Sequence, residues 1–226
     1  MHNIVALFDL DGTLCRGHIW KGFHKYYTKY RKRKMPSLLV FMITHMALWL
    51  LVKCKLLSRE KYILKWAEDF NNIFKGASKK EIFEISQWVV DNYLTELLRS
   101  DIVNILQQHK QQGHIVLLIS ATIRQLLEIV GQRLGVSNII GTELEIVDDI
   151  YSGKVSKPIC FGEGKAKLFQ KFINQNDLNV DLSSSFAYAD SIFDISLLKL
   201  VGHPIATYPD KNLQQFAENN GWQLLP

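Results

Sequence analysis

The chain has 226 residues, of which 47% are hydrophobic and 22% are charged, and its formal net charge at pH 7 is +5. One globular domain, or a core domain with a smaller insert, fits this length and composition. The three cysteines, Cys15, Cys54 and Cys160, are widely spaced, which excludes a CxxC motif and a disulfide framework and favours a reducing, cytoplasmic location. The first residues have no basic leader and only a short apolar run, so we expect no signal peptide.

The first predicted element is a strand over 4–8, because IVALF is a continuous apolar run of the kind buried on both faces. Residues 19–100 read almost entirely as helix, and Ser78 is a plausible N-cap within them. From residue 101 onward, predicted helices and strands alternate. The helices cover 102–112, 123–134 and 165–174, the strands cover 115–119, 138–140, 143–147 and 184–190, and a short βαβ tail follows.

This alternation predicts an α/β fold with a Rossmann-like, doubly wound and mostly parallel sheet. One strand precedes the helical block and the others follow it, so the block is interpreted as an all-helical cap inserted after the first strand. The predicted core covers 1–15 and 101–226, and the predicted cap covers 16–100. Ligands bind at the carboxyl ends of the strands in such sheets.

Polar side chains stand at three of these predicted strand ends. They are Asp9 with Asp11, Ser120 with Thr122, and Asp190 with Asp194. Converging carboxylates form a hard oxygen site suited to Mg²⁺, and a carboxylate can also attack phosphorus to form an aspartyl phosphate. A second carboxylate can shuttle the proton, while a hydroxyl and a lysine neutralise the phosphoryl oxygens. The competing interpretation, an Asp-rich turn and a helix N-cap, does not account for all three strand ends together.

Four segments carry a resemblance to a known family. They are FDLDGTL (8–14), LLISAT (117–122), GEGKAKLFQKF (162–172) and YADSIFD (188–194). In sequence, order and spacing they are similar to the four motifs of the haloacid dehalogenase superfamily. The chain resembles its phosphoserine-phosphatase-like branch, subclass IB, which implies a core of that family's fold with a helical cap.

The resemblance implies a Mg²⁺-dependent phosphomonoesterase that works through an aspartyl-phosphate intermediate. Carried over by position, Asp9 is the nucleophile and a metal ligand, and Asp11 is the general acid/base whose carbonyl also binds metal. Ser120 and Lys165 hold the phosphoryl group, and Asp190 is the remaining metal ligand, supported by Asp194. The other lysines nearby, Lys154, Lys157 and Lys167, are interpreted as surface charges.

Two positions depart from the phosphoserine phosphatase pattern. Phe193 stands where that branch usually has Asn, and His18 stands where it usually has a cap glutamate that holds the substrate's amino group. The sequence has no acid from residue 14 to residue 59, so phosphoserine is not favoured as the substrate. His18 is either a substrate contact or an exposed side chain.

The segment Met35–Val52 has no formally charged residue and follows a basic run that ends in RKRK. A single membrane span there would separate Asp9 from Ser120 and the later motifs, so spanning is rejected. Three interpretations of the segment remain: burial in the cap, an oligomer interface, or insertion into one leaflet of a membrane with the basic cluster on anionic headgroups. The segment resembles that of certain bacterial phosphatidylglycerophosphate phosphatases, which implies a lipid phosphate substrate and peripheral contact through Arg31–Val52 with the inner face of a membrane.

The substrate is therefore predicted to be a small phosphorylated metabolite or a lipid phosphate. The basic run is not accompanied by an RNA or DNA module, so no nucleic acid is expected. Two alternatives to a phosphatase remain: a membrane- or protein-binding module that keeps the fold with little catalysis, and a phosphotransferase to an acceptor other than water. The sequence predicts neither the oligomeric state nor the physiological substrate.

Overall fold

The protein, in a computed structural model, is described over residues 3–31 and 35–226, with side chains from 38 onward in the second range. A six-stranded sheet with the order β3-β2-β1-β6-β7-β8 forms its centre, and all neighbouring strands in it are parallel. Its strands are β1 (Val5–Phe8), β2 (Ile115–Ile123), β3 (Asn138–Thr142), β6 (Phe186–Ala189), β7 (His203–Thr207) and β8 (Gln223–Leu225). The predicted α/β fold with a doubly wound, mostly parallel sheet is confirmed.

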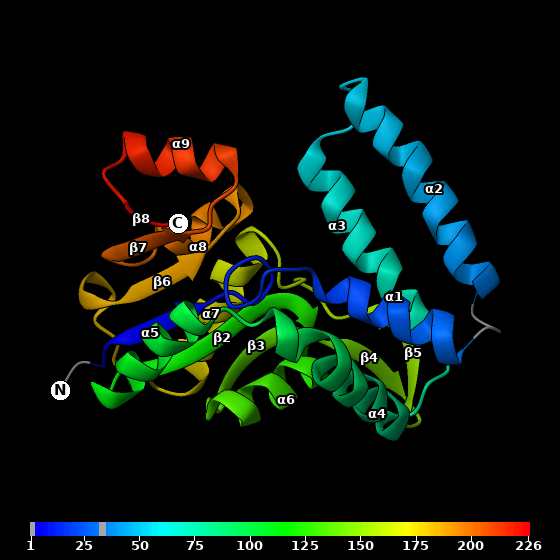
Figure 1. The fold of residues 1–226 in the computed structure, drawn as a ribbon, viewed down its shortest axis with the longest axis horizontal. Coiled ribbons are helices and arrows are strands. Elements are labelled where there is room, and N and C mark those ends of the chain that lie inside the picture. The colour runs from blue at the N-terminus through cyan, green and yellow to red at the C-terminus, as the bar shows by residue number, and fades with distance from the viewer. Residues whose placement is uncertain (1–2, 32–34) are drawn as a thin grey trace.

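Helices cover both faces of this sheet, as its continuous apolar strands require (Figure 1). In β1, Ala6 and Phe8 face one hydrophobic cluster, while Val5 and Leu7 face the other. Helices α5 (Ser100–Gln111) and α6 (Arg124–Leu134) contribute to the first cluster. Helices α7 (Glu163–Gln175), α8 (Ile195–Leu198) and α9 (Lys211–Asn219) contribute to the second.

The side of the sheet to which the chain adds new strands changes between β1 and β6. From β1 the chain first adds β2 and β3 on one side, and it later adds β6, β7 and β8 on the other. The loops that leave β1 and β6 therefore diverge, and they leave a crevice at the carboxyl ends of these two strands. Asp9 follows β1 and Asp190 follows β6, so this crevice lies between them.

Between β1 and α5 the described chain forms α1 (Ile19–Tyr30), α2 (Met35–Lys53), α3 (Arg59–Phe70) and α4 (Lys79–Val89). Ser78 caps α4 through a capping box with Glu81. Buried side chains of α4, such as Ile82, belong to the same hydrophobic cluster as Phe8 of the sheet. In contrast, α2 and α3 form a pair that stands away from the sheet (Figure 1). The division into a core and a cap at residues 16 and 100 stays a proposal.

The chain departs from the predicted elements between β2 and α7. The strand predicted over 115–119 continues to Ile123, because β2 resumes pairing with β3 after a register shift between Ile119 and Ile123. An unpredicted strand, β5 (Ile150–Val155), forms an antiparallel hairpin with β4 (Leu144–Val147). Ile150 also bridges to Ser78, so this hairpin supports the helices inserted after β1.

Most of α2 is exposed. Among its described side chains, Leu38 and His45 are buried and Phe41, Leu48 and Val52 are intermediate, whereas six apolar side chains are half exposed or more: Leu39, Val40, Met42, Ile43, Met46 and Leu50. Complete burial of Met35–Val52 in the cap is therefore wrong. Over the described part of the chain, no helix combines the length and the apolar character needed to span a membrane. Lys32, Arg33 and Lys34, part of the predicted membrane-contact segment, lie outside the described residues.

Candidate active site

Three acidic side chains meet at the crevice between β1 and β6. Asp9, Asp190 and Asp194 each place one carboxylate oxygen within 4.8 Å of the others. Asp194 comes from the short 3₁₀ turn Ile192–Asp194 that follows β6. Asp9 and Asp194 are buried, and Asp190 is half-buried. Residues separated by about 180 positions in the sequence thus converge because β1 and β6 are neighbours in the sheet.

Lys165 lies within this acidic cluster. Its Nζ is 2.8 Å from Oδ1 of Asp9 and 2.8 Å from Oδ1 of Asp194, and the side chain is almost completely buried. The other lysines of this region are exposed: Lys167 pairs with Glu163 on the surface of α7, and Lys157 pairs with Glu68. Lys165 is therefore the lysine that the fold brings to Asp9.

Asp11 occupies the turn that follows Asp9. Its Oδ1 accepts a hydrogen bond from the backbone N–H of Ile19 at 3.0 Å, and the thiol of Cys15 lies 3.9 Å away. The next residue, Gly12, has φ +80°, and a Cβ at this position would overlap the carboxylate of Asp190. The glycine therefore allows the Asp11–Gly12 backbone to lie directly against Asp190.

Ser120 lies within β2 rather than after its last residue. It belongs to the irregular stretch between Ile119 and Ile123, and its side chain is buried. Bulges commonly re-aim a side chain next to an active site, and Ser120 lines the same hollow as Asp9 and Lys165. Thr122 lies beside it, with its backbone N–H 3.4 Å from Oγ of Ser120.

The site carries more negative than positive charge. Burial, and secondly the proximity of Asp9, raises the pKa of Asp11 to about 7 and that of Asp190 to about 8. Burial also raises the pKa of Asp9 to about 6, although Lys165 opposes the shift. Burial alone would lower the pKa of Lys165, but the carboxylates of Asp194 and Asp9 outweigh it and raise this pKa above its usual value. The lysine is therefore charged, and a further cation would favour the ionised form of the acids around it.

The donor set fits Mg²⁺. Asp9, Asp190 and Asp194 supply closely spaced carboxylate oxygens, the ligands that hard divalent cations prefer. The close approach at Gly12 brings the backbone next to Asp11 near the carboxylate of Asp190. Asp194 was predicted only as a supporting residue, but its carboxylate belongs to the acidic cluster. Asp11 was predicted to contribute its backbone carbonyl rather than its carboxylate.

The helices inserted after β1 contribute mostly apolar side chains to the site. A hollow of about 550 Å³ opens above the acidic cluster, and Trp20, Tyr62, Ile63 and Trp66 line its cap side. His18 also lines this hollow, and burial, with the charge of Lys21, lowers the pKa of its imidazole. The sequence analysis missed these aromatic residues, although the spacing of Tyr62 and Trp66, one helical turn apart on α3, could have indicated a common face.

The side chain of Phe193 contacts both the core and the helices inserted after β1. Its ring packs 5.2 Å from that of Phe161, and the guanidinium of Arg59 at the start of α3 lies 5.5 Å from its centroid. Phe193 and Arg59 both line the hollow. The aromatic residue that replaces the expected Asn is therefore packed at the cap entrance.

Asp210 is a further acid that the sequence analysis missed. It follows β7 and caps α9, with Oδ1 accepting from the N–H groups of Asn212 and Leu213. Its Oδ2 accepts from the N–H of Ile192 at 3.2 Å, which fixes the loop after β6. Its position at the end of a predicted strand was the available signal.

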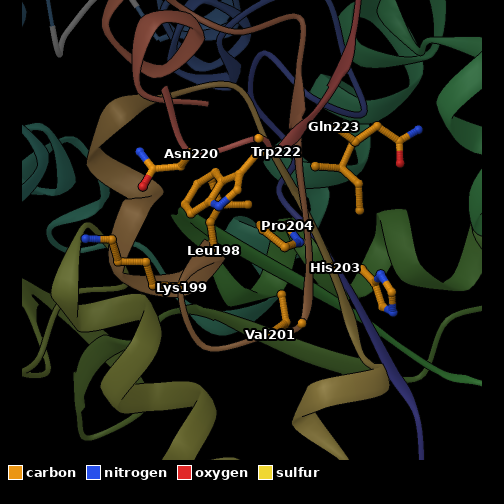
Figure 2. Close-up of a pocket in the computed structure, with 11 residues that line it drawn as sticks. Leu198, Lys199, Val201, His203, Pro204, Asn220, Trp222 and Gln223 are labelled. Carbon is orange, nitrogen blue, oxygen red and sulfur yellow. The ribbon is translucent and has the colours of Figure 1, made fainter. Parts of the chain in front are cut away.

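A second hollow, whose lining residues are drawn in Figure 2, has a similar volume of about 620 Å³ and shares no lining residue with the first. Its lining includes His203 and Gln223, the first residues of β7 and β8, together with Leu198 and Trp222. It therefore opens at the amino ends of the strands, at the edge of the sheet opposite Asp9. No carboxylate lines it among the described residues, so it offers no equivalent chemistry.

Comparisons with known proteins agree with this geometry. A family model described as haloacid dehalogenase-like hydrolase matches residues 6–199. The chain is 29% identical over 226 residues to phosphoserine phosphatase SerB1 of Mycobacterium tuberculosis, covering 97% of this chain and 69% of that protein. It is 31% identical over 150 residues to a histidinol-phosphatase of Neisseria meningitidis, covering 66% and 68%. A solved structure from Bordetella pertussis, a protein of unknown function, superimposes with a TM-score of 0.85 at 24% identity, covering 100% and 99% of the two chains.

Proposed function

Because the chain belongs to the haloacid dehalogenase-like hydrolase family, we propose that it is a Mg²⁺-dependent phosphomonoesterase that acts through an aspartyl-phosphate intermediate. Membership of the family confirms the predicted resemblance. One observation carries the proposal: Asp9 and Asp11 line one hollow, and the buried ammonium of Lys165 is held against Asp9. A nucleophile, a protonatable acid and a fixed cation are the groups that phosphoryl transfer requires.

In the proposed first step, a carboxylate oxygen of Asp9 attacks phosphorus while the bond to the leaving oxygen breaks. Lys165 engages Oδ1 of Asp9, which leaves Oδ2 for the attack. Asp11, whose raised pKa of about 7 favours the protonated form near neutral pH, donates its proton to the leaving oxygen. Ser120 and Lys165 hold the oxygens of the transferred group.

In the second step, water attacks phosphorus and the bond to Asp9 breaks. Asp11, now a carboxylate, takes the proton from that water and returns to its starting form. Bound Mg²⁺ would be held by the carboxylates of Asp9, Asp190 and Asp194 and the carbonyl of Asp11, and it would neutralise charge on the phosphoryl oxygens. The aromatic side chains of the cap exclude bulk water while the aspartyl phosphate exists.

The test is a phosphate-release assay with Mg²⁺ on phosphoserine, histidinol phosphate, sugar phosphates, nucleotides and phosphatidylglycerophosphate. The names of the curated relatives put the first two substrates on this panel. We expect release from at least one substrate by the wild type and none by Asp9→Asn. An Asp9→Asn variant as active as the wild type would overturn the proposal, whereas activity that appears only with an alcohol acceptor would favour the phosphotransferase.

A cytoplasmic location with peripheral membrane contact through Arg31–Val52 stays a prediction. It is supported by the exposed side chains of Leu39, Leu50 and Leu51 and by the absence of any acidic residue from α2. Lys53 and Lys55 follow this face and would meet anionic headgroups. Sedimentation with vesicles of anionic lipid, compared with vesicles of neutral lipid, tests the contact. Sedimentation by a protein inert on the whole panel would favour the binding module.

A further inference from the structure

The hollow above the acidic cluster shares its cap wall with a second, apolar groove. Trp20, Tyr62 and Trp66 line both spaces. The groove has a volume of about 640 Å³, and the rest of its lining comes from α2: Phe41, Met42, Ile43, His45, Met46 and Trp49. Both volumes lie within the range of ligand sites, about 300–1,000 Å³. The groove therefore adjoins, at these three side chains, the hollow that Asp9 lines.

The wall consists of aromatic rings that contact one another in two groups. The ring of Trp66 lies 5.5 Å from that of Trp20 and 5.6 Å from that of Phe41. The ring of Tyr62 lies 5.3 Å from that of Trp49. Tyr62 and Trp66 are one turn apart on α3, so one face of that helix borders both spaces.

Few polar groups line the groove. Among the described residues, His45 and Tyr62 are the ionisable residues in its lining. Nδ1 of His45 lies 3.0 Å from the carbonyl oxygen of Phe41, and its Nε2 lies 3.5 Å from Oδ2 of Asp69 without a hydrogen bond. A polar leaving group would find few partners here, and burial without a hydrogen bond is unfavourable.

The catalytic hollow has its acidic groups on one side only. Its carboxylates come from the core, including Asp9, Asp11 and Asp190. Among the described residues, the helices inserted after β1 add no carboxylate to the lining; their ionisable groups there are Arg59 and Tyr62, with His18 just before α1. A substrate ammonium group would therefore meet no acid on the cap side, where the leaving group packs.

From these contacts we infer that the preferred substrate is a phosphomonoester whose leaving group carries an extended apolar chain, which lies in the groove between α2 and α3. The inference rests on the proposed phosphatase function and names the substrate class of that site. Met42 and Met46, at least half exposed in the free protein, would be covered by this chain. Methionine side chains adapt to apolar ligands of different shape, which suits alkyl and acyl chains.

The test uses ethyl, hexyl and decyl phosphate, each below its critical micelle concentration, with Mg²⁺ and phosphate release as the readout. One methylene group moved from water into the groove contributes roughly a fourfold preference, so burial of three gives roughly 60-fold. We expect kcat/KM to rise from ethyl to decyl phosphate by at least this factor. Equal kcat/KM values for all three esters would overturn the inference and leave the phosphatase function standing. Release from no ester here and none on the earlier panel would overturn both.

A matched pair of variants tests whether the preference for long chains arises in the groove. Met46 lines the groove and Val40 does not, yet both lie on α2 with 64% of their surface exposed. Met46→Glu puts a charge into the groove and should lower the decyl-to-ethyl ratio of kcat/KM at least tenfold. Val40→Glu puts the same charge on another face of α2 and should leave the ratio within twofold. An equal loss in both variants would overturn the assignment to the groove.

Discussion

The ammonium group of Lys165 lies 2.8 Å from the carboxylate of Asp9, although 156 positions separate the two residues in the sequence. Asp194 completes the contact from the other side of the lysine, also at 2.8 Å. This arrangement fixes the orientation of the Asp9 carboxylate with respect to the hollow. The positive charge of Lys165 also allows the two acids to be buried together. Removal of Lys165 should therefore affect both catalysis and stability.

We predict that Lys165→Met lowers kcat for phosphate release at least 100-fold and destabilises the protein. The variant leaves the buried carboxylates of Asp9 and Asp194 without their cation, and breaking a buried pair in this way typically costs about 3–5 kcal/mol. The measurements are steady-state kinetics at saturating Mg²⁺ and chemical denaturation in EDTA. Lys167→Met is the control, because Lys167 pairs with Glu163 on the surface of the same helix. Its effect on stability should stay within about 0.5 kcal/mol, and similar losses in both variants would contradict the prediction.

Gly12 supplies a second prediction. Gly12→Ala meets two obstacles, a left-handed backbone with φ +80° and an overlap of the new Cβ with the carboxylate of Asp190. We expect at least a tenfold loss of activity and a higher Mg²⁺ concentration for half-maximal rate, because Asp190 must move. Gly113→Ala isolates the backbone contribution, since Gly113 has φ +77° and nothing within 4 Å of a Cβ. Gly113→Ala should lose about 1–2 kcal/mol of stability and Gly12→Ala more, because of the overlap with Asp190. Only Gly12→Ala should lose activity; equal activities would argue against the close packing on Asp190.

The parallel sheet and the convergence of Asp9 and Asp190 could be predicted, because continuous apolar runs identify buried strands and polar residues follow them. The strand β5 could not, since Ser152, Gly153 and Lys154 interrupt its pattern. The bulge that contains Ser120 was also missed, because it depends on pairing with β3 rather than on local sequence. The exposed side of α2 could not be predicted either, because the helix is apolar around its whole circumference and pattern alone assigns it no inner face.

Mg²⁺ should stabilise the protein more at pH 8 than at pH 5. Without metal, the pKa values of Asp9 and Asp190 are raised to about 6 and 8, from 3.8 for an unperturbed Asp. The folded state then binds more protons than the unfolded state between about pH 4 and pH 8, so stability falls as pH rises through this window. Bound Mg²⁺ favours the ionised acids and removes this loss. Thermal unfolding with Mg²⁺ and with EDTA at several pH values measures the difference, and Asp190→Asn should reduce it; a shift independent of pH would contradict the prediction.

His109 lies outside the active site, and we predict that its ionisation makes stability fall as pH is lowered, the opposite of the effect of the active-site acids. Its imidazole is buried between Phe8 and Phe186, with Nε2 2.8 Å from the hydroxyl of Tyr188 and Nδ1 2.8 Å from Nδ1 of His114. Burial, and secondly the nearby His114, lowers the pKa of His109 to about 4. Only the unfolded state then takes up the proton between about pH 6.5 and pH 4. The contribution of His109 to stability is therefore present above about pH 6.5 and is lost as pH falls to about 4.

The expected loss is on the order of 1–3 kcal/mol in the free energy of unfolding, since one unit of pKa shift corresponds to about 1.4 kcal/mol. Denaturation at saturating Mg²⁺ from pH 7.5 to pH 4.5 measures it as the difference between the wild type and His109→Gln. The glutamine can still hydrogen-bond the hydroxyl of Tyr188, but it does not titrate, so the variant should lose less stability than the wild type on acidification. His203→Gln, at an exposed position at the start of β7, should behave as the wild type does. Parallel curves for the wild type and His109→Gln would mean that His109 takes up its proton in the folded protein as readily as in the unfolded chain.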